Sequence, residues 1–75
     1  MNLNSLPKRT RARITAIHND DATLRKLLAL GVIEGVEVQI MHQGLIRRDP
    51  IGVRIDDRMI ALRRIEAKSI DVELI

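Results

Sequence analysis

RKLLALGVIEGVEV, residues 25–38, is the stretch that decides the fold of this chain. Its first half is typical of a leucine-rich helix that ends at Gly31, because glycine readily adopts the left-handed conformation of a helix C-cap. Gly35 then permits a turn, and the valines that follow alternate with polar residues, as in a half-buried strand. The stretch contains no catalytic constellation, so it favours a small binding module over an enzyme.

The helix is predicted over residues 22–30. Asp20 or Asp21 can cap it, because a carboxylate at this position accepts hydrogen bonds from the free N–H groups of the first turn. Three leucines at i, i+3 and i+4 spacing form its apolar stripe, namely Leu24, Leu27 and Leu28.

Outside the helix, apolar residues mostly alternate with polar ones. The predicted elements are strands at 12–17, 36–41, 51–55, 59–62 and 70–74, a frayed entry segment at 1–10, a loop at 43–50, a turn at Asp56-Asp57 and a helical turn at 63–68. Five short strands with one apolar face must curl to bury that face. The predicted fold is mainly β: a small, five-stranded, partly open barrel with one short α-helix and a C-terminal helical turn.

Composition limits the chain to one small domain, residues 1–75. No residue is cysteine, which excludes disulfides and thiolate metal sites, and none is aromatic. The N-terminus lacks the apolar run of a signal peptide, and no stretch of about 18 apolar residues exists to span a bilayer. We therefore expect a cytoplasmic protein.

Three segments in order resemble the FeoA family (ferrous iron transport protein A). They are the helix-turn-strand Lys26–Val38, the Asp49-Pro50-Ile51 loop and the closing segment Ala61–Val72. The resemblance implies an SH3-like barrel. It also implies a cytoplasmic accessory protein that binds FeoB, the membrane ferrous transporter with a GTP-binding domain, and modulates its activity. Such a protein would meet the membrane only through this partner, and self-association remains open.

RNA binding is the alternative function, because small barrels often bind RNA and the net charge is +3. Against it, proteins that bind single strands usually stack bases on aromatic rings, and the chain has none. Acidic residues of the outward strand faces (Glu37, Asp71 and Glu73) can also pair with Arg11, Arg13 and Arg54. We expect no nucleic-acid partner. The same lack of aromatic residues argues against a polyproline-binding groove.

A metal-sensing module, similar to the C-terminal SH3-like domain of iron-dependent repressors, is a third interpretation. It requires a DNA-binding domain, for which 75 residues leave no room. The only histidines, His18 and His42, fall at strand ends on the predicted inward phase, where one ordinary partner would satisfy each. We predict no metal site, no cofactor and no catalytic residues, since the chain also lacks a phosphate-binding glycine-rich loop.

The predicted partner-binding residues are Leu27, Leu30, Ile46, Arg47 and Arg48. The two-turn helix has more leucines than a small barrel needs, and the loop at 45–48 adds apolar and basic side chains that the expected fold places nearby. Apolar patches with polar rims mark interaction sites. In the other interpretation, Leu27, Leu28 and Ile46 plug the end of the barrel.

Overall fold

The computed structural model describes the backbone of all 75 residues and every side chain except those of Leu45 and Ile46. The elements, in order, are η1 (Leu3–Ser5), β1 (Ala12–Ile17), α1 (Asp21–Ala29), β2 (Glu37–Ile46), β3 (Asp49–Ile55), β4 (Arg58–Leu62), α2 (Arg64–Ala67) and β5 (Ile70–Leu74). Thus all five predicted strands, the helix and the C-terminal helical turn are confirmed.

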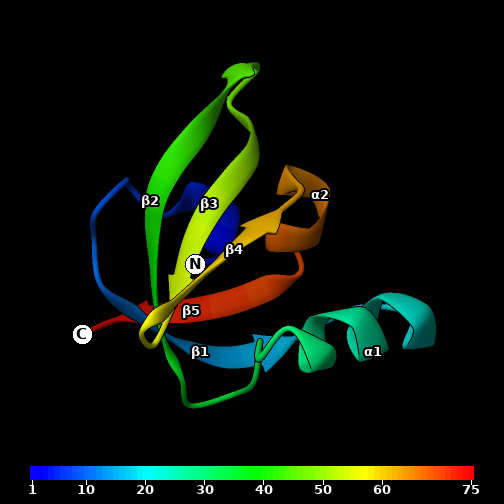
Figure 1. Cartoon of the computed structure of the whole chain (residues 1–75). Helices are drawn as coiled ribbons and strands as arrows, with labels where there is room; N and C mark the ends of the chain where they lie inside the picture. Colours follow the sequence, from blue (N-terminus) through cyan, green and yellow to red (C-terminus); the bar gives the residue numbers. More distant parts are fainter.

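The five strands form one antiparallel sheet in the order β4-β3-β2-β1-β5 (Figure 1). The sheet curls so that its apolar face turns inward, which confirms the SH3-like, partly open barrel. α2 packs against η1 and β3, and η1 packs against β5, so these two short helical elements link the two halves of the curled sheet. α1 projects from one side, between β1 and β2 in the chain (Figure 1).

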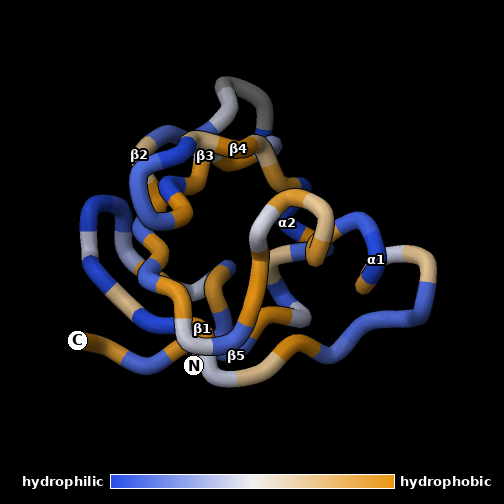
Figure 2. Tube along the Cα trace, turned by 60° about the horizontal axis from the view of Figure 1, so that its bottom comes forward, coloured by the Kyte–Doolittle hydropathy of each residue, from blue (hydrophilic) through white to orange (hydrophobic). Residues whose placement is uncertain are grey.

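The core is built from alternate residues of the strands, with a few side chains from the helical segments. Its members are Leu3, Leu6, Ala12, Ile14, Leu27, Val32, Val38, Ile40, Ile51, Val53, Ile55, Leu62, Ala67, Ile70 and Val72. In Figure 2 the segment that leads into α1 is hydrophilic, whereas much of the strands is hydrophobic. Of α1 only Leu27 belongs to the core, so the helix is peripheral and the sheet forms most of the core.

The N-terminal segment is anchored, so the prediction of a frayed entry was wrong. Leu3 and Leu6 are buried on one side of a 3₁₀ turn, and the backbone of Asn2 forms an isolated antiparallel β-bridge with that of Asp71 in β5. The backbone N–H of Val72 also donates to the carbonyl of Met1 at 2.8 Å. Two leucines three residues apart share one face of a 3₁₀ turn, which explains why this polar segment is held in place.

The predicted loop at 43–50 was also wrong, because β2 and β3 extend through it as a hairpin. Its turn consists of Arg47 and Arg48, both with positive φ (54° and 57°). Two left-handed residues twist a hairpin in the sense that the strands prefer. Gly44 permits the close approach of the two strands, since a Cβ there would lie 3.0 Å from the nitrogen of Pro50 and nearer still to the carbonyl of Asp49.

Both ends of α1 are as the sequence indicates. Asp20 is the N-cap, and its Oδ1 accepts a hydrogen bond of 2.8 Å from the N–H of Thr23. At the C-terminal end of the helix, Gly31 has a φ of 89°. The N–H groups of Gly31 and Val32 donate to the carbonyl oxygens of Leu28 and Leu27, respectively. This is the Schellman arrangement, and it buries Val32 against the core. Gly35 likewise has positive φ, as predicted.

Candidate interaction surface

The five predicted partner-binding residues do not form one surface. Arg47 and Arg48 are exposed at the tip of the β2–β3 hairpin, which Figure 1 shows well separated from α1. Leu27 is 0% exposed and belongs to the core, and Leu30 is partly buried against it. The expected proximity of helix and loop is thus wrong, because residues 43–46 extend β2 away from the barrel instead of folding back as a loop. The side chain of Ile46 lies outside the described residues.

Leu28 is 46% exposed although it belongs to the predicted apolar stripe. The stripe is wider than the contact between α1 and the sheet, so only Leu27 is completely buried and Leu24 is half-buried. The interpretation of Leu27 and Leu28 as a joint plug therefore holds for Leu27 alone.

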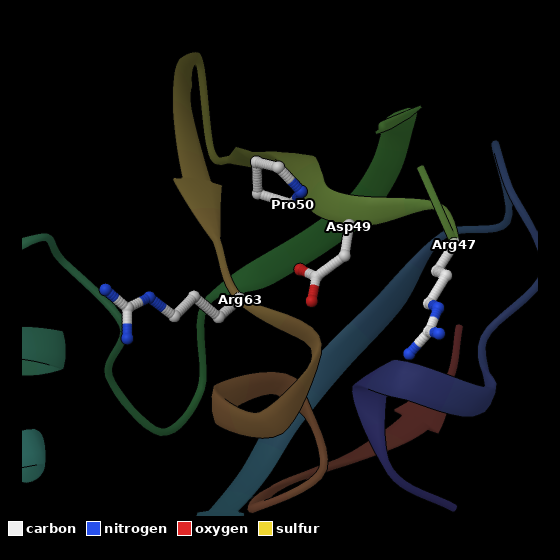
Figure 3. A pocket seen from close by; sticks show the side chains of 4 residues that line it. All are labelled: Arg47, Asp49, Pro50 and Arg63. Carbon is white, nitrogen blue, oxygen red and sulfur yellow. The ribbon is translucent and has the colours of Figure 1, made fainter. Parts of the chain in front are cut away.

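A shallow pocket of about 440 Å³ lies beside the turn of the β2–β3 hairpin. Arg47, Asp49, Pro50 and Arg63 line it (Figure 3). In this view the Asp49 carboxylate points towards α2, and the two arginines lie on either side of it. The Arg63 side chain extends away from Asp49, on the side opposite Arg47 (Figure 3), so the carboxylate and the apolar proline ring lie between two arginines whose guanidinium groups are apart.

Arg64, the first residue of α2, holds the wall of this pocket in place. Its backbone N–H donates to Oδ1 of Asp49 at 3.1 Å, and its Nε donates to the carbonyl of Arg48 at 2.8 Å. Its Nη1 also donates to Oδ1 of Asn4 at 2.8 Å, which adds η1 to the network. One arginine therefore joins the hairpin turn, α2 and the N-terminal segment.

The guanidinium groups of Arg47 and Arg63 are used differently from that of Arg64. Within the part of the chain whose side chains are described, neither group takes part in a hydrogen bond or an ion pair. Arg47 is exposed and so is Arg63, and both remain available to a ligand. Sequence analysis identified Arg47 but missed Arg63, which only the fold brings to the same pocket.

Glu66 is the one buried charged residue among the described side chains, and it connects α1 to α2. Its Oε1 accepts from the N–H of Arg63 at 2.9 Å, and its Oε2 accepts from Nζ of Lys26 at 2.7 Å. Burial raises the pKa of this carboxyl, but the hydrogen bonds from Lys26 and Arg63 and the positive charges of both outweigh it and hold the pKa below its ordinary value. Sequence analysis missed this link; a glutamate three residues after the N-cap was the available signal.

Two further apolar side chains are exposed near these elements. Ile65 of α2 is 74% exposed and lies between Arg64 and Glu66 in the chain, and Ile33, after α1, is 47% exposed. Ile65 is thus adjacent in the chain to residues that shape the pocket. The exposure of Ile65 could not be predicted from the sequence. The pattern predicts a helical turn at 63–68 but does not indicate which side of the turn faces the core.

Both histidines are exposed, so their predicted inward orientation was wrong. The register of the sheet shifts between Ile40 and His42, and such an irregularity turns the following side chain to the other face. His18 pairs through Nε2 with Oδ2 of Asp71 at 2.8 Å. Among the described residues, no three His, Asp or Glu side chains gather in a way that could hold a metal ion.

Opposite charges on the outer face of the sheet pair only in part as predicted. Arg11 forms a two-point hydrogen-bonded ion pair with Glu37, at 2.8 and 2.9 Å. The hydrogen bond from Arg11, together with nearby positive charges, holds the pKa of Glu37 below its ordinary value despite some desolvation. Arg13 instead donates to the carbonyl of Gly35, and Asp71 pairs with His18.

A family model described as the FeoA domain matches residues 1–74. Among solved structures, FeoA from Stenotrophomonas maltophilia in complex with zinc, described as a procaryotic SH3 domain protein, is 34% identical with a TM-score of 0.82; the alignment covers 97% of this chain and 89% of that one. No curated protein matched the sequence.

Two solution structures are also similar. Iron(II) transport protein A from Clostridium thermocellum is 33% identical with a TM-score of 0.93, and the match covers all of this chain but 46% of that protein. FeoA from Chlorobium tepidum is 30% identical with a TM-score of 0.89, over 99% of this chain and 70% of that one. None of the described helices is long and apolar enough to cross a membrane.

Proposed function

Because the chain belongs to the FeoA domain family, we propose that it is a cytoplasmic accessory protein of ferrous iron transport, which binds the GTP-binding part of a FeoB-type membrane transporter and modulates its activity. The observation that carries this proposal is the match of the FeoA domain over residues 1–74, essentially the whole chain. The proteins of the family found among solved structures include an iron(II) transport protein.

The surface around α2 supports a role in binding another protein. It contains an exposed isoleucine, Ile65, two residues after Arg63, which lines the basic pocket. An apolar anchor next to charged groups that can form hydrogen bonds is the usual composition of a protein interface.

A pull-down tests the proposal. The tagged full chain is used as bait for the purified GTP-binding part of the FeoB-type transporter from the same organism, and GTP hydrolysis is measured with and without the chain. We expect retention of the transporter and a changed rate of hydrolysis or of iron uptake in vesicles. An absence of retention at high micromolar concentrations would refute the proposal.

Matched variants locate the contact. Ile65→Ser removes an exposed apolar side chain from α2, and Met59→Ser removes one of 51% exposure from β4. We expect only the first to weaken retention, by about tenfold, as for a surface anchor. Salt-dependent retention of the chain on RNA, with none on the transporter, would favour the alternative function instead.

A further inference from the structure

Building on the proposed function, we infer that the pocket lined by Arg47, Asp49, Pro50 and Arg63 receives an acidic peptide segment of the transporter partner. In this arrangement, the two guanidinium groups bind carboxylates of the segment, and Asp49 accepts a hydrogen bond from one of its N–H groups.

The charges of the pocket determine the class of ligand. Arginine binds carboxylates through two parallel hydrogen bonds, and such charge-assisted bonds are about twice as strong as neutral ones. Arg47 and Arg63 are on opposite sides of Asp49 in Figure 3, so two carboxylates of one segment can be held by one guanidinium each. Pro50 adds an apolar surface for the aliphatic part of such a side chain.

Asp49 favours a peptide over a phosphate or a nucleic acid as the ligand. Its Oδ1 already accepts the N–H of Arg64, which orients the carboxylate, and no described hydrogen bond uses its Oδ2. A free acceptor of this kind suits the backbone N–H of a peptide, whereas the ionised phosphates of a nucleic-acid backbone offer it acceptors only. The pocket also contains no aromatic ring on which a base could stack.

The pocket is organised before any ligand arrives. Arg64 ties the hairpin turn to α2 and η1 through three hydrogen bonds, and Glu66 fixes the N–H of Arg63. Because the backbone of the receiving residues is already held, binding has to order only the two arginine side chains, and less conformational entropy is lost.

Nuclear magnetic resonance titration of the full chain tests this inference. The probe is the blocked peptide acetyl-Gly-Glu-Ala-Glu-Gly-amide, and its control has glutamine in place of both glutamates. We expect the amide resonances of residues 47–49, 51 and 63–66 to shift with the acidic peptide and not with the control peptide. Shifts confined to other parts of the chain would refute the site.

Three charge-matched variants sharpen the test. Arg47→Gln and Arg63→Gln should each weaken binding of the acidic peptide by about tenfold, the effect of losing one charged hydrogen-bonding pair. Arg54→Gln removes the same charge from an exposed position on β3, outside the pocket, and should change affinity by less than about twofold. Equal weakening in all three would mean that only net charge matters and would overturn the inference. Equally strong competition by inorganic phosphate or by a 12-nucleotide RNA would overturn it as well.

The same variants separate this inference from the proposed function. If the native chain retains the transporter and Arg63→Gln retains it equally well, the proposed function stands and the pocket is not the docking site. If the native chain does not retain the transporter but the acidic peptide binds as described, the proposed function fails while the chemistry of the pocket is supported.

Discussion

Lys26 Nζ donates a hydrogen bond of 2.7 Å to Oε2 of Glu66, a residue 40 positions further along the chain. This contact joins α1 to α2. It adds a second attachment to a helix of which only Leu27 is completely buried. The glutamate side chain is 9% exposed and the lysine 52%, so the carboxylate is the partner that depends more on the contact. A buried carboxylate that loses its cation is costly, because it remains desolvated without compensation.

Glu66 makes stability depend on pH in the acid range. Because its pKa in the folded protein lies below its ordinary value, the contribution is fully present above the ordinary glutamate pKa of about 4.3 and is lost as pH falls through the lower folded value. Glu66→Gln should cost about 1–3 kcal/mol at pH 7 and progressively less as pH falls below 4. Thermal melts from pH 7 to pH 3 measure both curves, with Glu37→Gln as a control that should lose less, because the side chain of Glu37 is 36% exposed and that of Glu66 is 9% exposed. Parallel curves for the native chain and Glu66→Gln would contradict this assignment.

Gly31 should be required for stability because of both its backbone and its neighbour. Its φ of 89° is strained for any other residue, and a Cβ there would collide with the guanidinium of Arg58, which donates to the carbonyl of Leu30 at 2.9 Å. Gly31→Val should destabilise the fold by more than about 1 kcal/mol, and Gly31→Ala by about 1 kcal/mol or more.

Chemical denaturation of a matched set separates these two causes. Gly35→Ala meets the same backbone strain, with a φ of 93° but no atom within 4 Å of the added Cβ, so it should cost less than Gly31→Ala. In an Arg58→Ala background the cost of Gly31→Ala should fall towards that of Gly35→Ala. An unchanged cost in that background would show that the guanidinium moves aside freely.

Leu27 and Leu28 are adjacent in α1, but their truncation to alanine should reduce the stability of the fold by very different amounts. Leu27 is 0% exposed, so Leu27→Ala should cost about 2–5 kcal/mol through lost burial and a cavity. Leu28 is 46% exposed, and Leu28→Ala should cost less than about 1 kcal/mol. Melting temperatures of the two variants check this directly. Equal losses would mean that α1 packs by a different face.

The chain should not bind Fe(II) tightly by itself. His18 has one acidic partner, Asp71, and no third ligand group joins them among the described residues. Stable iron sites use several nitrogen and oxygen ligands, so two leave the ion mostly to water. Anaerobic calorimetric titration decides the matter, and a one-to-one site of micromolar affinity or better would refute this prediction. His18→Ala would then show whether this pair is responsible.

The local sequence determined the elements and most of the core. Alternation identified Ile51, Val53 and Ile55 as one buried row, because strand side chains alternate between faces whatever the strand pairs with. Asp20 and Gly31 marked both ends of α1, since capping depends on the residue and its nearest neighbours alone. The resemblance to the FeoA family, which the family model confirms, was likewise present in short segments of sequence.

Tertiary structure alone decided which of these side chains meet. Arg47 and Arg63 line one pocket because a hairpin and a helical turn, distant in sequence, converge at the same end of the sheet. The hairpin was missed because Arg47 and Arg48 lack the usual signal of a left-handed turn, and pairing of β2 with β3 imposes that conformation on them. Leu27 and Leu28 are chemically identical, and only the packing of α1 against the sheet makes one a core residue and leaves the other at the surface. Burial depends on the whole fold, which no local pattern contains.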